Sequence, residues 1–256
     1  MRYAGVVVDL DGVCYLGEEP IPGSAAAVAR LRAAGVGVAF ATNNATHTPE
    51  RYAATLSSLG FDARPEDVVT SAVAAAGLLE PGTRCLVVGA DGLRTAARER
   101  GCVLVDDPAQ AQAVLVGLDR QITYERLKAG TRALLAGARF VASNVDGTYP
   151  DADGLSPGAG AIVAALERAS GLVPEVAGKP EPALFRSAAT RLPEGPLLMI
   201  GDRPDTDLAG AAALGWDTAL VLSGVTSAED AERLDSPPTY VADDLAALVD
   251  DLLGAA

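Results

Sequence analysis

The chain has 256 residues, 49% hydrophobic and 21% charged, which is enough for one large domain or two smaller domains with packed cores. Its 34 acidic residues outnumber its 20 basic residues and give a formal net charge of −14, which argues against nucleic acids and anionic membrane surfaces as partners. The single histidine, His47, argues against most zinc sites and against a Ser-His-Asp triad. Catalysis would therefore use carboxylates, lysine, hydroxyl groups or a metal ion.

Nothing in the sequence indicates secretion or a membrane span. Met1-Arg2 leads directly into an apolar run that ends in acidic residues, which is not a signal-peptide pattern. No apolar run approaches the length that crosses a bilayer. The three cysteines, Cys14, Cys85 and Cys102, are far apart and typical of reduced thiols. We therefore expect a cytoplasmic protein.

Strand-like and helix-like patterns alternate along the chain, which predicts an α/β protein with mainly parallel sheets. The runs that predict strands are 5–8, 36–42, 84–88, 113–117, 139–143, 197–201 and 218–222. The stretches that predict helices are 24–34, 49–59, 91–100, 124–136, 158–169, 182–191, 207–214 and 243–253. Ligands of such sheets bind beyond the carboxyl ends of the strands, where this chain places Asp9, Thr42, Asn144 and Asp202.

The first of these strand ends carries two acidic residues, Asp9 and Asp11, followed by Gly12. Two neighbouring carboxylates repel each other, so the pair costs stability unless a cation binds there. A hard divalent ion such as Mg²⁺ would satisfy both through oxygen ligands. Gly12 allows a sharp turn close to a ligand. The alternative is that Asp9 only caps a loop.

Two later motifs carry groups that suit an anion. Thr42, Asn43 and Asn44 offer a hydroxyl group, amides and backbone N–H groups at a strand end, although the same residues also suit an Asx or Ser/Thr turn. Lys179 stands between Gly178 and Pro180 at the start of a predicted helix and supplies a point charge for phosphate. The alternative is a solvated surface lysine.

The last motif, residues 201–207, is again an apolar strand that ends in acid. Asp205 and Asp207 have an alternative role as helix N-terminal caps. Asp202, directly after Gly201, is harder to explain in that way.

A domain boundary is indicated at two turns. Glu80-Pro81-Gly82 precedes a fresh strand-helix unit, and Leu172-Val173-Pro174 closes the region. The segment of about 100 residues between them suits a small α/β domain. We therefore predict a core formed by 1–79 and 175–256, with 80–174 inserted into it.

The ordered set of four motifs resembles the haloacid dehalogenase-like (HAD) phosphatase superfamily, and nearly the whole chain takes part. The match is similar to the subclass with a type IIA (C2a) cap, which includes NagD-like, p-nitrophenyl-phosphate, phosphoglycolate and glycerol-phosphate phosphatases. The matching segments are 9–13, 22–23, 42–45, 117–119, 142–146, 157–161, 178–180 and 201–207. The resemblance implies a Rossmann-like core with a parallel sheet and an inserted smaller α/β cap domain.

The resemblance also implies a Mg²⁺-dependent hydrolase of phosphoric monoesters. Asp9 would attack phosphorus and form an aspartyl-phosphate, while Asp11 would protonate the leaving group and then activate water. Mg²⁺ would bind the Asp9 carboxylate, the Asp11 backbone carbonyl and the Asp202 carboxylate. Asp207 would order metal-bound water or Lys179.

The phosphate would be held by residues from the first three motifs. Gly12, Thr42, Asn43 and Asn44 would bind the phosphoryl oxygens, and Lys179 would offset the charge of the phosphate and of Asp9.

The cap would exclude water and recognise the leaving group. By resemblance, the loop 144–150 would contact the substrate, with Tyr149 in the specificity position and Leu118 as a second candidate. Ordinary packing is an equal alternative for Tyr149. Neither residue is cationic, so the cap offers no obvious site for a second phosphate; if one exists, Arg120 is the nearest candidate.

The expected partner is a small-molecule phosphate ester: p-nitrophenyl phosphate, phosphoglycolate, glycerol phosphate, a sugar phosphate or a nucleoside monophosphate. A homodimer through the cap is a further expectation from the subclass. Haloacid dehalogenation on the same scaffold is an alternative, but that chemistry needs neither Asp11 nor a metal. A non-catalytic sensor of phosphorylated ligands is another, but it would be expected to lose Asp9 or Asp11. A dinucleotide-binding domain is a weaker alternative, because no G-x-G-x-x-G follows the first strand.

Overall fold

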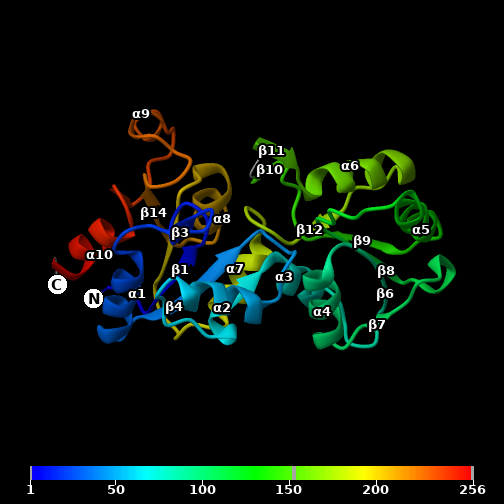
Figure 1. Ribbon diagram of the computed structural model, residues 1–256, viewed down its shortest axis with the longest axis horizontal. Coiled ribbons are helices and arrows are strands. Elements are labelled where there is room, and N and C mark those ends of the chain that lie inside the picture. The colour runs from blue at the N-terminus through cyan, green and yellow to red at the C-terminus, as the bar shows by residue number, and fades with distance from the viewer. Residues whose placement is uncertain (1, 152–153, 255–256) are drawn as a thin grey trace. The chain divides into compact units, whose positions relative to one another are not determined.

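The computed structural model describes residues 2–151 and 154–254, which form two compact units (Figure 1). The first unit comprises Met1–Thr42, Pro49–Val69 and Phe185–Ala256, and the second comprises Asn43–Thr48 and Thr70–Leu184. The α/β class with parallel sheets is confirmed, because each unit has its own sheet with parallel strand pairs.

The sheet of the first unit has six strands in the order β15-β14-β13-β1-β4-β5. They are β15 (Tyr240–Ala242), β14 (Asp217–Val221), β13 (Leu197–Gly201), β1 (Gly5–Asp9), β4 (Gly37–Thr42) and β5 (Val68–Thr70). The chain leaves β1 toward β4 and returns to β13 on the other side of β1. The strand order therefore reverses between β1 and β13, and the carboxyl ends of strands at such a point form a binding crevice.

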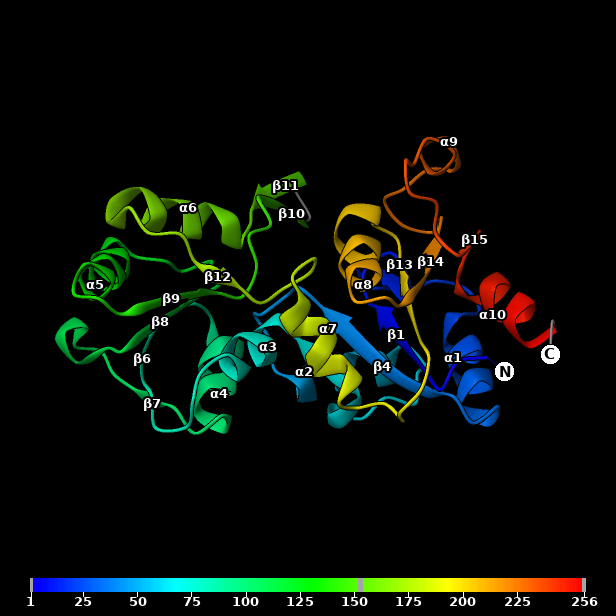
Figure 2. The same ribbon diagram turned by 180° about the vertical axis from the view of Figure 1, so that it is seen from behind.

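One face of this sheet is covered by three helices whose apolar sides form a single core with it. They are α1 (Ser24–Ala33), α2 (Pro49–Ser58) and α10 (Leu245–Gly254), and α1 lies beside α10 (Figure 2). Phe40 of β4 is fully buried in this core and meets Phe61 edge-on, with ring centroids 6.1 Å apart. Burial of a side chain of that size contributes roughly 1.5–3 kcal/mol, so the core holds the strand ends in place.

The other elements of the first unit are short or lie outside that core. They are β2 (Tyr15–Leu16), β3 (Glu19–Pro20), a 3₁₀ turn (Pro65–Asp67), a π-helical turn (Pro204–Leu208), α8 (Ala209–Ala213) and α9 (Ala228–Ala231). Helix α7 (Pro182–Ala189) contains the division between the units.

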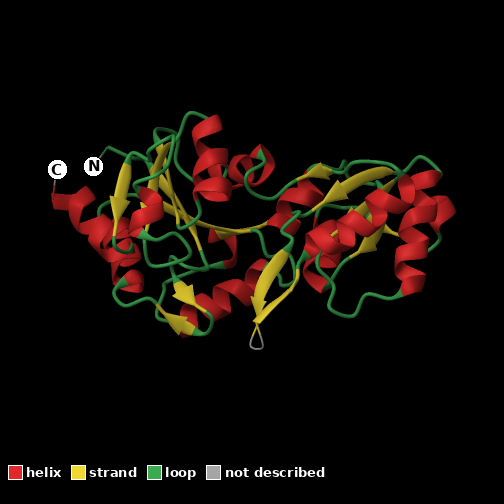
Figure 3. Ribbon diagram, turned by 90° about the horizontal axis from the view of Figure 1, so that it is seen from above, coloured by secondary structure: helices red, strands yellow, loops and turns green. Residues whose placement is uncertain are grey.

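The second unit has a five-stranded sheet in the order β12-β9-β8-β6-β7. Its strands are β12 (Glu175–Val176), β9 (Arg139–Ala142), β8 (Ala113–Val116), β6 (Arg84–Val88) and β7 (Val103–Leu104). Its helical segments are α3 (Ser71–Gly77), α4 (Asp91–Glu99), a 3₁₀ turn (Pro108–Gln110), α5 (Tyr124–Leu135) and α6 (Ala159–Ser170). Strands β10 (Thr148–Asp151) and β11 (Gly154–Pro157) form a separate antiparallel hairpin, visible as paired strands in Figure 3.

The cap boundaries at 80 and 174 stay a prediction, and the second compact unit contains more of the chain at both ends. Helix α3 belongs to it because α3 packs against α4. The segment after β12 belongs to it because Ala177 N–H donates to the Ala142 carbonyl at 2.9 Å. Within 2–151 and 154–254, the helices are too short or too polar to cross a lipid bilayer.

Candidate active site

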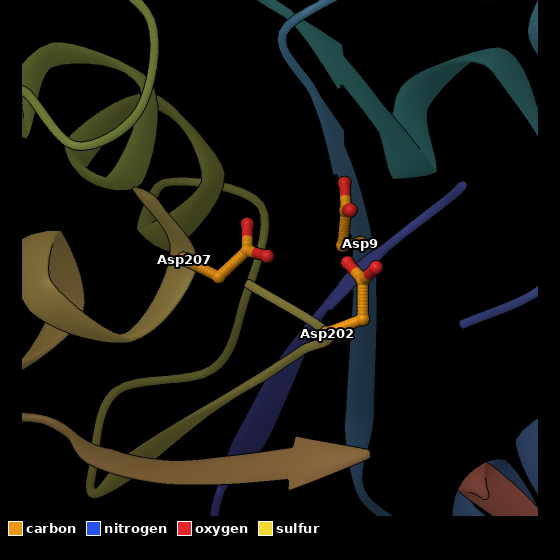
Figure 4. Close-up of side chains that lie close together, drawn as sticks. All are labelled: Asp9, Asp202 and Asp207. Carbon is orange, nitrogen blue, oxygen red and sulfur yellow. The ribbon is translucent and has the colours of Figure 1, made fainter. Parts of the chain in front are cut away.

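Three buried carboxylates meet at the carboxyl edge of the first unit's sheet. Asp9 is the last residue of β1, and Asp202 directly follows β13, which pairs in parallel with β1 so that Val8 lies opposite Ile200. Asp207 comes from the π-helical turn after β13. Carboxylate oxygens of the three residues lie within 4.8 Å of one another, and their exposed fractions are 7%, 2% and 0% (Figure 4).

This cluster fits a hard divalent cation. Three carboxylates concentrated in a buried place repel each other, and burial disfavours their charged forms, so the arrangement costs free energy by itself. Carboxylate oxygens are the ligands that Mg²⁺ and Ca²⁺ prefer. The cluster contains the predicted ligands Asp9 and Asp202, and it brings the Asp207 carboxylate to the same place.

Asp202 is held by the loop after β14, which the sequence reasoning did not identify. Val225 N–H donates to Asp202 Oδ2 at 2.8 Å, and the Thr226 hydroxyl donates to the Asp202 carbonyl at 2.6 Å. The Ser223 hydroxyl donates to the Gly12 carbonyl at 2.7 Å. The signal that could have identified this loop was its position, since residues 222–226 follow an apolar strand, as the motifs of Asp9, Thr42 and Asp202 do.

Two glycines are required by how closely these loops approach Asp202. A Cβ atom at Gly224 would lie 2.1 Å from Asp202 Oδ2, and one at Gly12 would lie 2.4 Å from the same atom. Gly12 also has φ +82°, in the left-handed region that favours glycine. A side chain at either position would therefore collide with the Asp202 carboxylate.

Asp207 lies in a wider turn than the sequence predicted. A helix was expected from 207, but the chain first forms the π-helical turn Pro204–Leu208, and α8 follows it. Within this turn, Arg203 N–H donates to Asp207 Oδ2 at 3.1 Å, and Asp207 N–H donates to the Arg203 carbonyl at 2.9 Å. Asp205 is exposed and lies 3.4 Å from the Arg203 guanidinium, so it stays outside the cluster.

The two aspartates of the first motif have different surroundings. Asp9 is buried, whereas Asp11 is exposed on the turn that Gly12 N–H closes by donating to the Tyr15 carbonyl at 2.8 Å. The Cys14 thiol lies 3.4 Å from the Asp9 carbonyl and donates to it. Burial raises the pKa of that thiol well above its usual value, and the charges of Asp9 and Asp11 raise it further. The thiol therefore stays a neutral donor beside the carboxylates.

Thr42 belongs to the same unit and is 3% exposed at the carboxyl end of β4. Ala41 pairs with Asp9 in the parallel ladder between β4 and β1, so Thr42 is placed one residue beyond the Asp9 level.

Asn43 and Lys179 meet in the second unit. Asn43 Oδ1 accepts a hydrogen bond from Lys179 N–H at 2.7 Å, and Asn43 Nδ2 donates to the Lys179 carbonyl at 3.1 Å. Lys179 is 5% exposed, which excludes the interpretation as a solvated surface lysine. Asn44, which follows Asn43, accepts hydrogen bonds at its Oδ1 from the backbone N–H and the hydroxyl group of Thr46. It therefore forms the Asx turn that was the alternative for the motif of residues 42–44.

The predicted specificity residues also lie in the second unit. The Arg120 guanidinium lies over the Tyr149 ring at 4.9 Å from its centroid and 3.9 Å from the Asp151 carboxylate. The Tyr149 hydroxyl donates to the same carboxylate at 3.2 Å. Leu118 is half-buried directly after β8 and its neighbour Gly117.

Comparison with known proteins identifies the family. The haloacid dehalogenase-like hydrolase family matches residues 6–103, and a HAD-hydrolase-like family matches residues 176–248. The acid sugar phosphatase of Staphylococcus aureus strain USA300 is 37% identical over 249 residues, covering 95% of this chain and 96% of the relative. The chain belongs to the haloacid dehalogenase-like hydrolase family.

Solved structures agree with this membership. A glycerol phosphate phosphatase from Mycobacterium tuberculosis, solved in complex with magnesium, is 40% identical with a TM-score of 0.89, covering 96% of this chain and 76% of that one. A p-nitrophenyl phosphatase from Archaeoglobus fulgidus is 31% identical with a TM-score of 0.92, covering 98% and 100% of the two chains. These relatives confirm that this HAD chain is an enzyme, a hydrolase of the phosphatase type. The magnesium complex agrees with the Mg²⁺ prediction.

Proposed function

We propose that this HAD chain is a Mg²⁺-dependent phosphatase that hydrolyses small phosphomonoesters, such as sugar and glycerol phosphates, through an aspartyl-phosphate on Asp9. The observation that carries the proposal is the buried cluster of Asp9, Asp202 and Asp207 at the switch point of the sheet. It places one candidate nucleophile beside two further carboxylates in a site that suits a divalent cation.

In the first step, an Asp9 carboxylate oxygen attacks phosphorus. A bond forms between that oxygen and phosphorus, and the bond between phosphorus and the ester oxygen breaks. Asp11 donates its proton to the leaving alkoxide, which departs as an alcohol. The exposure of Asp11, in contrast to the burial of Asp9, supports this division of roles.

In the second step, Asp11 removes a proton from water. The resulting hydroxide attacks phosphorus, the bond to Asp9 breaks, and inorganic phosphate leaves with Asp9 restored. Mg²⁺, when bound by Asp9, Asp202 and the Asp11 carbonyl, supplies positive charge that offsets the charge of the phosphate. Asp207 would orient that site, and Thr42, the Gly12 N–H group and Lys179 would bind the phosphoryl group.

The substrate class rests on the relatives and on Arg120. The relatives are named acid sugar phosphatase, glycerol phosphate phosphatase and p-nitrophenyl phosphatase. The Arg120 guanidinium is already stacked on Tyr149 and close to Asp151, so its charge is offset within the second unit. We therefore propose substrates with one phosphate and an uncharged leaving group, such as a sugar or a polyol.

The test is phosphate release from a panel of esters, with Mg²⁺ and with EDTA. The panel contains a sugar monophosphate, a sugar bisphosphate, glycerol phosphate, phosphoglycolate, a nucleoside monophosphate and p-nitrophenyl phosphate. We expect Mg²⁺-dependent release, with the sugar monophosphate or glycerol phosphate preferred over the bisphosphate. Release of halide from a haloacid, or ligand binding without any turnover, would instead support the dehalogenase or the sensor.

A further inference from the structure

Asn43 is the centre of a hydrogen-bond network within the second unit. Its side chain bonds to both backbone groups of Lys179, at 2.7 Å to the N–H and 3.1 Å to the carbonyl. Its Nδ2 also lies 3.3 Å from the nearer carboxylate oxygen of Asp146. One amide therefore contacts three polar groups that are distant in sequence.

The partners determine which way this amide points. The Lys179 N–H group can only donate, so it requires the amide oxygen. The Lys179 carbonyl and the Asp146 carboxylate can only accept, so they require the amide nitrogen. A carboxylate of the same shape at position 43 would place an oxygen against two acceptors.

The backbone of Asn43 is held from the other side. Its carbonyl accepts hydrogen bonds from the Ser71 hydroxyl and from Asn144 Nδ2, the latter at 2.7 Å. A Cβ atom at Gly178 would lie 2.6 Å from Asn43 Oδ1, so only glycine lets the Lys179 segment come this close. The position of Asn43 is thus fixed, and its side chain in turn fixes the backbone of Lys179.

We propose that Asn43 is a positioning residue for Lys179: its side chain fixes the Lys179 backbone and is not itself a ligand of the phosphate. This inference rests on the proposed function, in which Lys179 binds the phosphoryl group. It revises the assignment carried by the resemblance, which placed Asn43 among the phosphate ligands. Any contact of residue 43 with the phosphate is therefore made by its backbone N–H group.

The first variant that tests the proposal is Asn43→Asp. It keeps the acceptor for Lys179 N–H but replaces the donor by an oxygen that repels the Lys179 carbonyl and Asp146. Displacement of a catalytic group by about 1 Å costs about 100-fold in rate, so we expect kcat to fall by about that factor. The affinity for Mg²⁺ should not change, because the carboxylate cluster consists of Asp9, Asp202 and Asp207 and Asn43 is not part of it.

A double-mutant cycle separates positioning from direct phosphate binding. If Asn43 acts through Lys179, Asn43→Asp adds nothing in a Lys179→Met background, and the double variant loses as much kcat/KM as Lys179→Met alone. If both side chains bind phosphate independently, the two losses multiply. Multiplied losses would overturn the proposal.

A second measurement needs no turnover. The chain has only two lysines, Lys128 and Lys179, so lysine labelled with carbon-13 at Cε gives two NMR signals. The Lys128 ammonium pairs with Glu125 in α5 and serves as an internal reference. Asn43→Asp should shift or broaden the Lys179 signal and leave the Lys128 signal unchanged. An unchanged Lys179 signal would also overturn the proposal.

Gln110→Ala is the matched control for Asn43→Asp. It removes an exposed amide that bonds to Asp107, and it should leave both lysine signals and kcat unchanged. If the wild-type protein releases no phosphate, the proposed function fails, yet the NMR result still decides whether Asn43 positions Lys179. Unfolding temperatures identify any variant that fails to fold, and Ser71→Ala then provides a milder change in the same network.

Discussion

Val225 N–H donates a hydrogen bond to Asp202 Oδ2 at 2.8 Å, and the hydroxyl group of the next residue, Thr226, donates to the Asp202 carbonyl at 2.6 Å. The loop after β14 therefore fixes both the side chain and the backbone of Asp202. A carboxylate that is already oriented loses less conformational freedom when it binds a metal ion.

Replacement of Asp202 should weaken metal binding. Asp202→Ala removes one of the three carboxylates that lie within 4.8 Å of one another, so we expect at least a tenfold higher Mg²⁺ requirement or no activity. Calorimetric titration with Mg²⁺ and activity at graded Mg²⁺ concentrations provide the measurement. Asp205→Ala is the matched control, because Asp205 is exposed in the same turn. An unchanged Mg²⁺ requirement in Asp202→Ala would refute the ligand role.

A side chain at position 224 should disturb Asp202 without removing any ligand. In Gly224→Ala, the new Cβ would lie 2.1 Å from Asp202 Oδ2, so the loop or the carboxylate has to move. We expect Mg²⁺ affinity to fall by about 10- to 100-fold, measured by calorimetry. Gly77→Ala is the control, since nothing lies within 4 Å of its Cβ position. Equal affinities in the two variants would contradict the role of the loop.

Replacement of Asp9 should abolish turnover while the fold remains. Asp9→Asn keeps the shape of the side chain but removes the nucleophilic charge, so no aspartyl-phosphate forms. It also removes one of three repelling carboxylates, so the metal-free variant should unfold at the same or a higher temperature than the metal-free wild type. Phosphate release and thermal unfolding measure the two effects. Turnover at the wild-type rate would refute the assignment of Asp9 as nucleophile.

The buried thiol of Cys85 should make stability fall at alkaline pH. Burial raises the pKa of Cys85 to about 12, with a smaller contribution from Cys102. Below pH 9 the thiol is protonated in both the folded and the unfolded protein. Between pH 9 and about pH 12 the thiol loses its proton only in the unfolded protein. The free energy of unfolding then falls by about 1.4 kcal/mol per pH unit from this group.

Cys85→Ala tests this effect through the slope. The variant is less stable at neutral pH because it leaves a cavity, but its stability should depend less steeply on pH above 9. Urea unfolding at several pH values between 7 and 10.5 measures both quantities. Parallel curves for the two proteins would show that the thiol ionises equally in both states.

The main strands of both sheets were predictable because apolar runs mark them. The expected strand 197–201 is β13, and the expected strand 36–42 differs from β4 by one residue. The short strands β7, β12 and β15 were not predicted, since two or three residues carry too little periodicity. The hairpin of β10 and β11 was also missed, because its strands form a sheet apart from the main one.

The candidate site was predictable in part for a related reason. The motifs of Asp9 and Asp202 each follow an apolar run, and carboxyl ends of neighbouring parallel strands meet at one edge, so Asp9 and Asp202 were expected together. Asp207 was expected in a helix, and the π-helical turn that brings it to the cluster has no signature in the periodicity.

The sequence by itself determined the order of the strands' polar ends, the acidic character of the site and the presence of only two lysines. Only the tertiary structure decided which groups hold the site residues. The hydrogen bonds from Val225 to Asp202 and from Lys179 to Asn43 join residues 23 and 136 positions apart. Backbone N–H groups occur at nearly every residue, so local pattern does not show which of them a carboxylate or an amide will meet. The tertiary fold of each unit brings those partners together.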